Sequence, residues 1–172
     1  MNDARSVNVR ADLWPTFAGR GAGSLFEVEA WIQSEIKAIS PLVERLMRLI
    51  EGSHCITGEE PAVELALREA LSNAVVHGNR LDAHKLVHVR CRCKVREGIS
   101  LIVSNRGQGF DPRTIPDPVT IENLEKDHGR GIHLMKLAMD EVSFDERGTE
   151  IHMSKRPARN PRGDFRSDSR GS

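Results

Sequence analysis

The sequence predicts an α+β fold, a two-layer α/β sandwich with a mixed, mostly antiparallel sheet covered on one face by helices. Two observations carry this prediction. Segments whose apolar residues recur at helical spacing alternate with segments whose apolar residues recur at every second position. In the second kind of segment, polar and apolar side chains separate onto two faces, which is typical of a sheet buried on one side only.

Composition narrows the classes of function. The 172 residues suffice for one domain with a sizeable core, and the net charge is zero, so no overall field favours nucleic acid or membranes. Aromatic residues make up only 4% of the chain, which argues against a surface that stacks nucleic-acid bases. The sequence has neither an apolar run long enough to cross a bilayer nor a signal peptide. We therefore expect a cytoplasmic protein that contacts neither nucleic acid directly nor membrane.

The chain divides into three parts. Residues 1–24 combine glycine, serine and mixed charge without periodicity, and are predicted to be a flexible leader. Residues 25–156 contain all the periodic segments and are predicted to form the only folded domain. Residues 157–172 are polar and rich in arginine, and are predicted to be a disordered basic tail.

The first half of the domain is predicted to contain one strand and two helices. Leu25–Ile36 alternates loosely and is expected to be the strand. A helix follows, with Ser40 as its N-cap, a proline as its first residue and Gly52 as its stop. The second helix is predicted from about Pro61 to His77, and Gly78 is expected to end it.

The period of the apolar residues changes to two between residues 87 and 103. Two strands of this kind, separated by a turn at Arg96–Gly98, are predicted to pair antiparallel. A third helix is expected to begin near Gly131. The last hairpin is predicted from Glu141–Phe144, a turn, and Thr149–Met153.

The three cysteines lack the paired spacing that is usual in zinc sites. Cys91 and Cys93 lie on the same face of a predicted strand, so they cannot form a relaxed disulfide with each other. We expect Cys55, Cys91 and Cys93 to be buried thiols in a reducing compartment.

Polar side chains follow one border of the apolar stripe on the second helix. Glu69, Asn73 and His77 are four residues apart, so they stack when each residue turns the helix by about 100°. A carboxylate here can act as a general base, and an amide oxygen is a hard ligand suited to Mg²⁺. On this helix alone, surface residues near a helix end are the more ordinary interpretation.

Two glycine-rich segments could bind a phosphate ligand through their backbone. Gly107 and Gly109 follow a predicted strand and let a ligand approach the backbone. Gly129 and Gly131 precede the third helix, whose first backbone N–H groups form an anion site. The P-loop pattern G-x-x-x-x-G-K-[ST] is absent from the sequence, so another kind of nucleotide site is indicated.

Four motifs in this order resemble those of the GHKL ATPases, which have the Bergerat fold. The likeness is closest to the bacterial anti-sigma factor serine/threonine-protein kinases. The motifs are EALSNAVVHGN, VSNRGQGFDP, HGRGIHLM and FDERGTEIHM, and the similar region spans about residues 25–156. Since this region is about three quarters of the chain, the resemblance implies a Bergerat fold for the whole predicted domain.

The resemblance implies roles at the phosphate end of the site. Glu69 would be the general base, and Asn73 would bind the Mg²⁺ that accompanies ATP. Asn79 would lie near the phosphates. The lid over the phosphates would include Gly129, Arg130 and Gly131.

The resemblance also implies roles around the adenine. Gly107 and Gly109 would shape the pocket, and Thr149 would lie behind the base, where its hydroxyl can bond directly or through water. Asn105 stands where the family usually has an aspartate that accepts from the adenine amine. An amide keeps one acceptor but loses charge assistance, worth about 1 kcal/mol. We therefore expect weakened ATP binding or a changed base preference.

The function that the resemblance implies is an ATP-dependent protein serine kinase that is also an anti-sigma regulatory factor. It would bind a sigma factor and phosphorylate a serine on an anti-anti-sigma protein of the STAS type. The resemblance also suggests a homodimer. The alternative is a partner-binding regulatory module with weakened or no ATP catalysis, because Asn105 replaces the usual aspartate. The catalytic half of a two-component histidine kinase is disfavoured, because the segment before EALSNAVVHGN leaves no room for a phospho-acceptor helical hairpin.

Overall fold

The computed structural model describes residues 25–109 and 127–158. The predicted leader at 1–24 and the greater part of the predicted tail lie outside the described residues, as do residues 110–126.

One layer of the structure is a five-stranded sheet with the order β1-β2-β3-β5-β4. The strands are β1 (Leu25–Gln33), β2 (Leu86–Lys94), β3 (Gly98–Ser104), β4 (Glu141–Phe144) and β5 (Glu150–Lys155). Every neighbouring pair is antiparallel. The predicted sandwich is therefore confirmed, but the described strands contain no parallel pair of the kind that would make the sheet mixed.

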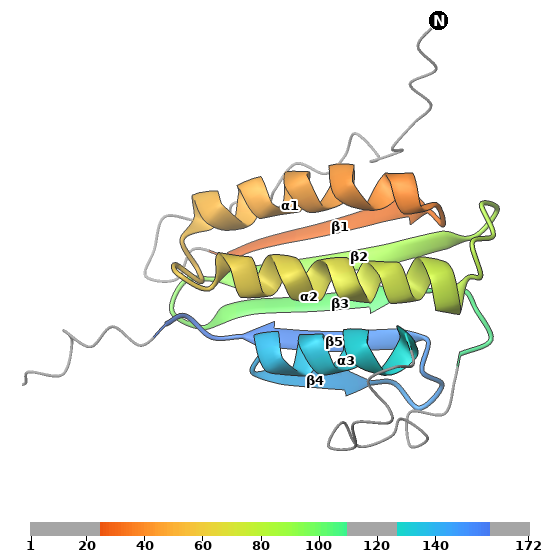
Figure 1. The fold of residues 1–172 in the computed structure, drawn as a ribbon. Helices are drawn as coiled ribbons and strands as arrows, with labels where there is room; N and C mark the ends of the chain where they lie inside the picture. Colours follow the sequence, from red (N-terminus) through yellow and green to blue (C-terminus); the bar gives the residue numbers. More distant parts are fainter. Residues whose placement is uncertain (1–24, 110–126, 159–172) are drawn as a thin grey trace, which may run out of the picture.

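The second layer consists of helices that cover one face of the sheet (Figure 1). These are α1 (Ile39–Ser53), α2 (Glu60–Ser72) and α3 (Asp127–Ala138). A short 3-10 helix, η1 (Ile36–Ala38), leads into α1, and a π-helix, η2 (Asn73–Gly78), continues α2 directly. Among the helices described, none has the length and apolar character needed to cross a membrane.

An aliphatic core lies between the two layers. The inward side chains of β2 are each at most 1% exposed, and they are Val87, Val89, Cys91 and Cys93. The core also receives Met135 of α3 and Met139, which directly follows this helix, as their spacing of four residues predicts. The alternation of period two therefore identified the buried face of the sheet correctly.

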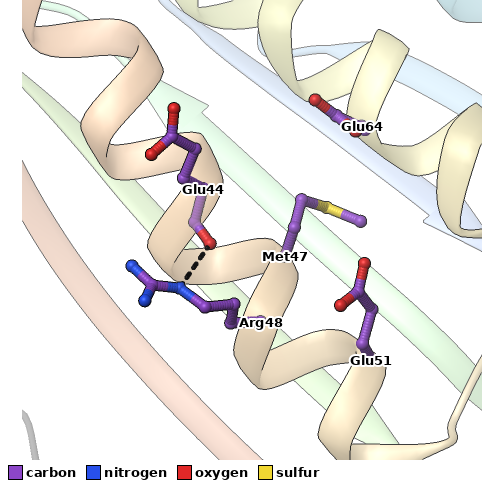
Figure 2. A pocket seen from close by; sticks show the side chains of 5 residues that line it. All are labelled: Glu44, Met47, Arg48, Glu51 and Glu64. Atoms are coloured by element: carbon purple, nitrogen blue, oxygen red, sulfur yellow. Dashed lines mark hydrogen bonds between the residues drawn. The ribbon is translucent and has the colours of Figure 1, made fainter.

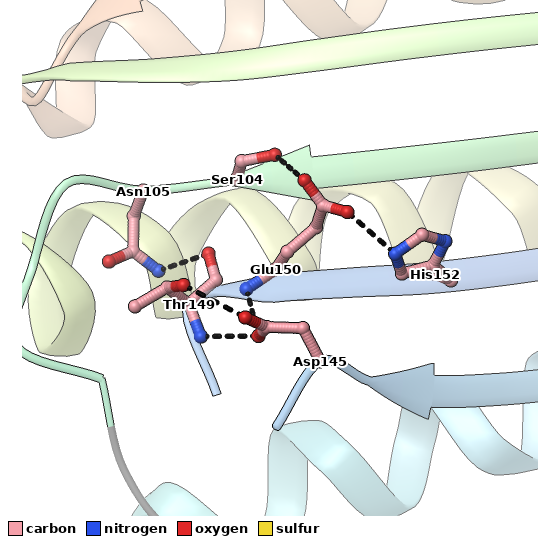
Figure 3. A network of polar contacts seen from close by, with 6 residues as sticks. All are labelled: Ser104, Asn105, Asp145, Thr149, Glu150 and His152. Atoms are coloured by element: carbon pink, nitrogen blue, oxygen red, sulfur yellow. Dashed lines mark hydrogen bonds and ion pairs between the residues drawn. The ribbon is translucent and has the colours of Figure 1, made fainter. Parts of the chain in front are cut away.

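The outer face of the sheet is polar. Arg90 of β2 donates to Glu29 of β1 at 2.7 Å, and this hydrogen bond is the main reason that the pKa of Glu29 is lowered. Ser104 of β3 donates to Glu150 of β5 at 2.7 Å, and the other oxygen of Glu150 contacts His152 (Figure 3). These cross-strand pairs fit the predicted division of the sheet into a core face and a polar face.

The ends of α1 differ from the prediction. The N-cap is Ala38, whose methyl side chain cannot accept a hydrogen bond, and Ser40 lies inside the first turn. The Ser40 hydroxyl instead accepts a hydrogen bond from Arg68 of α2 at 3.3 Å. At the other end, His54 adopts the left-handed conformation (φ 55°) that Gly52 was expected to supply. The Ser40 side chain thus bonds to the neighbouring helix and does not cap α1.

A disulfide joins Cys55, in the α1–α2 connection, to Cys93 of β2, with Cα atoms 6.1 Å apart. Cys91 is free and fully buried, and desolvation raises the pKa of its thiol to about 12. The prediction of three thiols is therefore wrong for Cys55 and Cys93. The sequence could not show this pairing, because helix packing on the sheet brings together two residues separated by 38 positions.

Candidate functional site

The helix that carries the predicted base changes its winding inside the EALSNAVVHGN motif. The backbone N–H of Asn79 donates to the carbonyl of Ala74 at 2.8 Å, five residues back, as in a π-helix. Such wider turns are frequent at functional sites. Asn73 and His77 both lie in this wider turn; Asn73 is half-buried and His77 is exposed.

Glu69 and Asn73 face α3 at Gly131. A Cβ atom on Gly131 would lie 2.8 Å from Oε2 of Glu69 and 3.4 Å from Nδ2 of Asn73. The first distance is shorter than Cβ contacts allow, so glycine lets the backbone of α3 approach the carboxylate. The structure thus brings the predicted base, the predicted metal ligand and one predicted lid residue to the same place.

The start of α3 was predicted too late in the chain. The helix begins at Asp127, so Gly129 and Arg130 lie in its first turn and Gly131 in its second. Arg130 is exposed, and Gly131 is buried. Two glycines interrupt the apolar pattern at this end and obscured the helical period. Each glycine costs a helix about 1 kcal/mol relative to alanine, which tertiary packing can offset.

The donor set suits the ligands that the motifs imply. Glu69 and Asn73 offer carboxylate and amide oxygens around one point, and Mg²⁺ prefers such hard oxygens. The missing Cβ at Gly131 lets the backbone of α3 lie directly against these groups. The first turn of α3 adds backbone N–H groups and the Arg130 guanidinium, which favour phosphate oxygens. Asn73 would therefore hold the Mg²⁺ and Arg130 the phosphates of a nucleotide, with Glu69 beside them as the predicted base.

Asn79 is fully buried and joins three segments. Its Nδ2 donates to the carbonyl of Leu86 at 3.1 Å, and its Oδ1 accepts from the backbone N–H of Arg106 at 2.9 Å. These bonds tie the end of η2 to the start of β2 and to the loop after β3. Asn79 thus has a structural role, and its place near the phosphates stays a prediction.

Asn105, at the end of β3, is bonded at both ends of its side-chain amide. Its Nδ2 donates to the carbonyl of Thr149 at 3.1 Å (Figure 3), and its Oδ1 accepts from the backbone N–H of Gly107 at 2.8 Å. A reversed amide would place donor against donor and acceptor against acceptor, so these partners fix its orientation.

The end of η2 contacts the glycine loop around this amide. A Cβ atom on Gly78 would lie 2.5 Å from Cγ of Asn105. A Cβ atom on Gly107 would lie 2.8 Å from Oδ1 of Asn105 and would collide with the carbonyl oxygen of Gly78. The EALSNAVVHGN and VSNRGQGFDP motifs therefore meet, and only glycine at both positions permits this approach.

The turn between β4 and β5 completes this end of the site. Gly109 has a φ of 74°, and a Cβ atom there would lie 2.9 Å from Cγ2 of Thr149 and would collide with the carbonyl oxygen of Arg147. The glycine loop thus packs on the turn. The structure brings together all four residues predicted around the adenine, namely Asn105, Gly107, Gly109 and Thr149, and their contact with the base stays a prediction.

Asp145 holds this turn and was missed by the sequence reasoning. Its Oδ1 accepts from the backbone N–H groups of Thr149 (2.7 Å) and Glu150 (2.8 Å), and its Oδ2 accepts from the Thr149 hydroxyl at 3.2 Å (Figure 3). Burial acts to raise the pKa of Asp145, but the backbone bonds from Glu150 and Thr149 outweigh burial, and the pKa is lowered. The signal was an aspartate at the start of a glycine-containing turn.

A hollow of about 340 Å³ lies away from these residues, between α1 and α2. Figure 2 shows its lining, which is Glu44, Met47, Arg48, Glu51 and Glu64. The lining has three carboxylates and one guanidinium, and Glu64 is also paired with Arg68 at 2.8 Å. The hollow contains none of the residues that the motifs identify, and those residues come together at the contacts described above.

Residues 32–155 match the histidine kinase-like ATPase domain, and this range includes every predicted site residue. No curated protein gives a significant match to the chain.

Proposed function

Because the chain belongs to the family of histidine kinase-like ATPase domains, we propose that it is an ATP-dependent protein serine kinase and an anti-sigma regulatory factor. Membership in this family makes the chain a GHKL-type ATP-binding domain of the kinase-like ATPase class. The observation that best supports catalysis is the meeting of Glu69, Asn73 and Gly131.

In the proposed reaction, Glu69 removes the proton of the substrate serine while the serine oxygen attacks the γ-phosphorus of ATP. The bond from that phosphorus to its bridging oxygen breaks, and ADP leaves. Asn73 would hold Mg²⁺, which neutralises phosphate charge when it is bound. Arg130 and the first N–H groups of α3 stabilise the negative charge of the transferring phosphoryl group.

The proposed substrate is a serine of an anti-anti-sigma protein of the STAS type, and the proposed second partner is a sigma factor. The four motifs support these partners through their likeness to the anti-sigma factor kinases. Phosphorylation adds about two negative charges to the substrate serine. Such a change is large enough to switch the affinity of the two partners for each other.

Replacing the base tests the catalytic role. Glu69→Ala should leave Mg-ATP binding within about twofold of the native chain but lower phosphoryl transfer by about 10²–10⁴-fold, since this is the usual worth of a general base. Calorimetry measures the first quantity, and radiolabel transfer to the STAS-type protein, with ATP and GTP compared, measures the second.

The matched control is Glu51→Ala, which removes an exposed carboxylate from α1. It should transfer phosphate at the native rate. Retained transfer in Glu69→Ala would contradict the role assigned to the base.

A second candidate function is a partner-binding module with weak or no catalysis. The observation that favours it is the internal bonding of Asn105, whose amide is already engaged by Thr149 and Gly107. Calorimetry of the native chain with Mg-ATP separates the two functions. If the native chain does not bind Mg-ATP, the kinase proposal fails and the binding module stands.

A further inference from the structure

We propose that Asn105 is a positioning residue that clamps three segments of the nucleotide site, and that an aspartate at this position would weaken the site. The three segments are the glycine loop, the end of η2 and the start of β5. The part of this inference that concerns nucleotide affinity rests on the proposed function. The part that concerns the clamp rests on hydrogen bonds of the chain alone.

The carbonyl of Thr149 is a shared acceptor for Asn105. It accepts two hydrogen bonds from Asn105, one from the backbone N–H at 2.9 Å and one from Nδ2 at 3.1 Å. An ionised carboxylate has no hydrogen to donate, so one of its oxygens would face this carbonyl oxygen as a second acceptor. The contact would change from attraction to repulsion.

The side chain at position 105 has little room for another arrangement. Oδ1 of Asn105 accepts from the backbone N–H of Gly107, and the side chain lies against Gly78 so closely that a Cβ there would be 2.5 Å from Cγ. Turning the side chain away would give up the bond to Gly107 and would open the contact with η2. An aspartate would therefore keep the position of the amide and face Thr149.

A protonated aspartic acid at position 105 could make the same contacts as the amide. A neutral carboxyl group has one O–H donor and one acceptor oxygen, so it reproduces the two bonds of the amide. The folded state of an Asn105→Asp variant would favour this neutral form, which raises the pKa of the new carboxyl above its unfolded value of about 3.9. The unfolded state then binds fewer protons between the two pKa values, so stability relative to the native chain falls as the pH rises through this window.

The charged side chains near the clamp are the same in the native chain and in the variant. They come from the glycine loop, η2, the β4–β5 turn and β5, and they are Arg106, His77, Asp145, Arg147 and Glu150. The titration that these groups have in common in both chains is subtracted when the variant is compared with the native chain at each pH, and what is left includes their effect on the new carboxyl group. The difference therefore reports the new carboxyl group.

An aspartate at position 105 would bring both a gain and a loss in nucleotide affinity. A charged acceptor for the adenine amine would strengthen binding by about fivefold at most. Loss of the clamp displaces Gly107 and Thr149, two of the four residues predicted around the adenine, and we expect the affinity lost with them to exceed this fivefold gain. The net expectation is weaker binding of ATP.

The experiment compares four chains: the native chain, Asn105→Asp, Asn105→Ala and Gln33→Glu. Gln33→Glu makes the same amide-to-carboxylate change at an exposed end of β1. Thermal unfolding without nucleotide is measured at pH 4.5 and 7.5, and Mg-ATP affinity is measured by calorimetry at pH 7.5.

Asn105→Asp should unfold several degrees below the native chain at pH 7.5, with a smaller deficit at pH 4.5, and should bind Mg-ATP at least tenfold more weakly. Asn105→Ala should show a deficit that is the same at both pH values, because it introduces no titrating group. Gln33→Glu should match the native chain in both measurements.

An Asn105→Asp chain that is as stable as the native chain at pH 7.5, or that binds Mg-ATP more tightly, overturns the inference. An Asp variant that folds only at pH 4.5 is the extreme form of the expected result. One that folds at neither pH, while Asn105→Ala folds at both, contradicts the donor argument. If the native chain does not bind Mg-ATP but the stability pattern is found, the proposed function fails and the clamp stands.

Discussion

At the scale of single residues, the candidate site depends on glycines, which have no side chain, as much as on its polar side chains. Gly78, Gly107 and Gly131 each lie where a Cβ would meet a functional side chain or a backbone carbonyl. The sequence showed that glycines were there, and the structure shows which neighbour each one admits. Only Gly131 admits the predicted base.

Gly131→Ala tests this contact. The new methyl group would meet Oε2 of Glu69 at 2.8 Å, and the flexible end of Glu69 would move instead of the helix. We expect phosphoryl transfer to fall by about 10–100-fold, because displacement of a catalytic group by about 1 Å has such an effect. The free energy of unfolding should change by less than about 1 kcal/mol.

The matched control for this substitution is Gly52→Ala in α1. A Cβ there meets nothing within 4 Å, so the alanine should stabilise the helix by about 0.5–1 kcal/mol and leave transfer unchanged. Denaturant unfolding and the transfer assay measure the two effects. Equal rates in Gly131→Ala and the native chain would show that Glu69 does not need its present position.

At the scale of elements, periodicity identified the strands and the apolar helix faces, but not the details of winding. The π-helical turn at Asn73–Gly78 continues the same apolar stripe as α2, so the pattern alone cannot distinguish it from an α-helix. The cap of α1 was also missed, because Ser40 bonds to Arg68 of the neighbouring helix. Both differences concern the winding of the backbone, which the spacing of apolar residues does not resolve.

The Cys55–Cys93 disulfide joins the α1–α2 connection to the sheet and closes a loop that contains α2 and η2. Closing a loop with a sequence separation of 38 stabilises a fold by about 3–4 kcal/mol in the chain-entropy account. We therefore expect a reducing agent to lower the free energy of unfolding by an amount of this order. Urea unfolding with and without the reductant measures the difference.

The control for the reductant is the double variant Cys55→Ser and Cys93→Ser, which should unfold at the same urea concentration under both conditions. Alkylation of the unfolded native chain without reductant should modify Cys91 alone. Three modified cysteines in that experiment would show that the disulfide does not form in solution.

At the scale of the whole molecule, the sheet order decides which motifs can meet. The order β1-β2-β3-β5-β4 places the end of β3 beside the start of β5, which brings Asn105 to Thr149. Packing of α3 on α2 then brings Gly131 to Glu69. The site is therefore a property of the complete domain.

Binding of Mg-ATP to such a site should stabilise the whole domain. At a free concentration of one hundred times Kd, mass action contributes about 2.7 kcal/mol, which raises the unfolding temperature by about 5–10 °C for a chain of this size. Thermal unfolding with Mg-ATP and with Mg-GTP measures the effect and the base preference. An unchanged unfolding temperature with both nucleotides at millimolar concentration would contradict nucleotide binding.

The sequence alone determined the sandwich, its buried faces and the kinds of group available for chemistry, because periodicity and residue type are properties of single segments. The tertiary structure alone decided that Cys55 reaches Cys93, that Asn79 and Asn105 bond to the backbone of other segments, and that Glu69 lies against Gly131. These contacts join residues far apart in the chain. They depend on strand order and helix packing, which no local pattern contains.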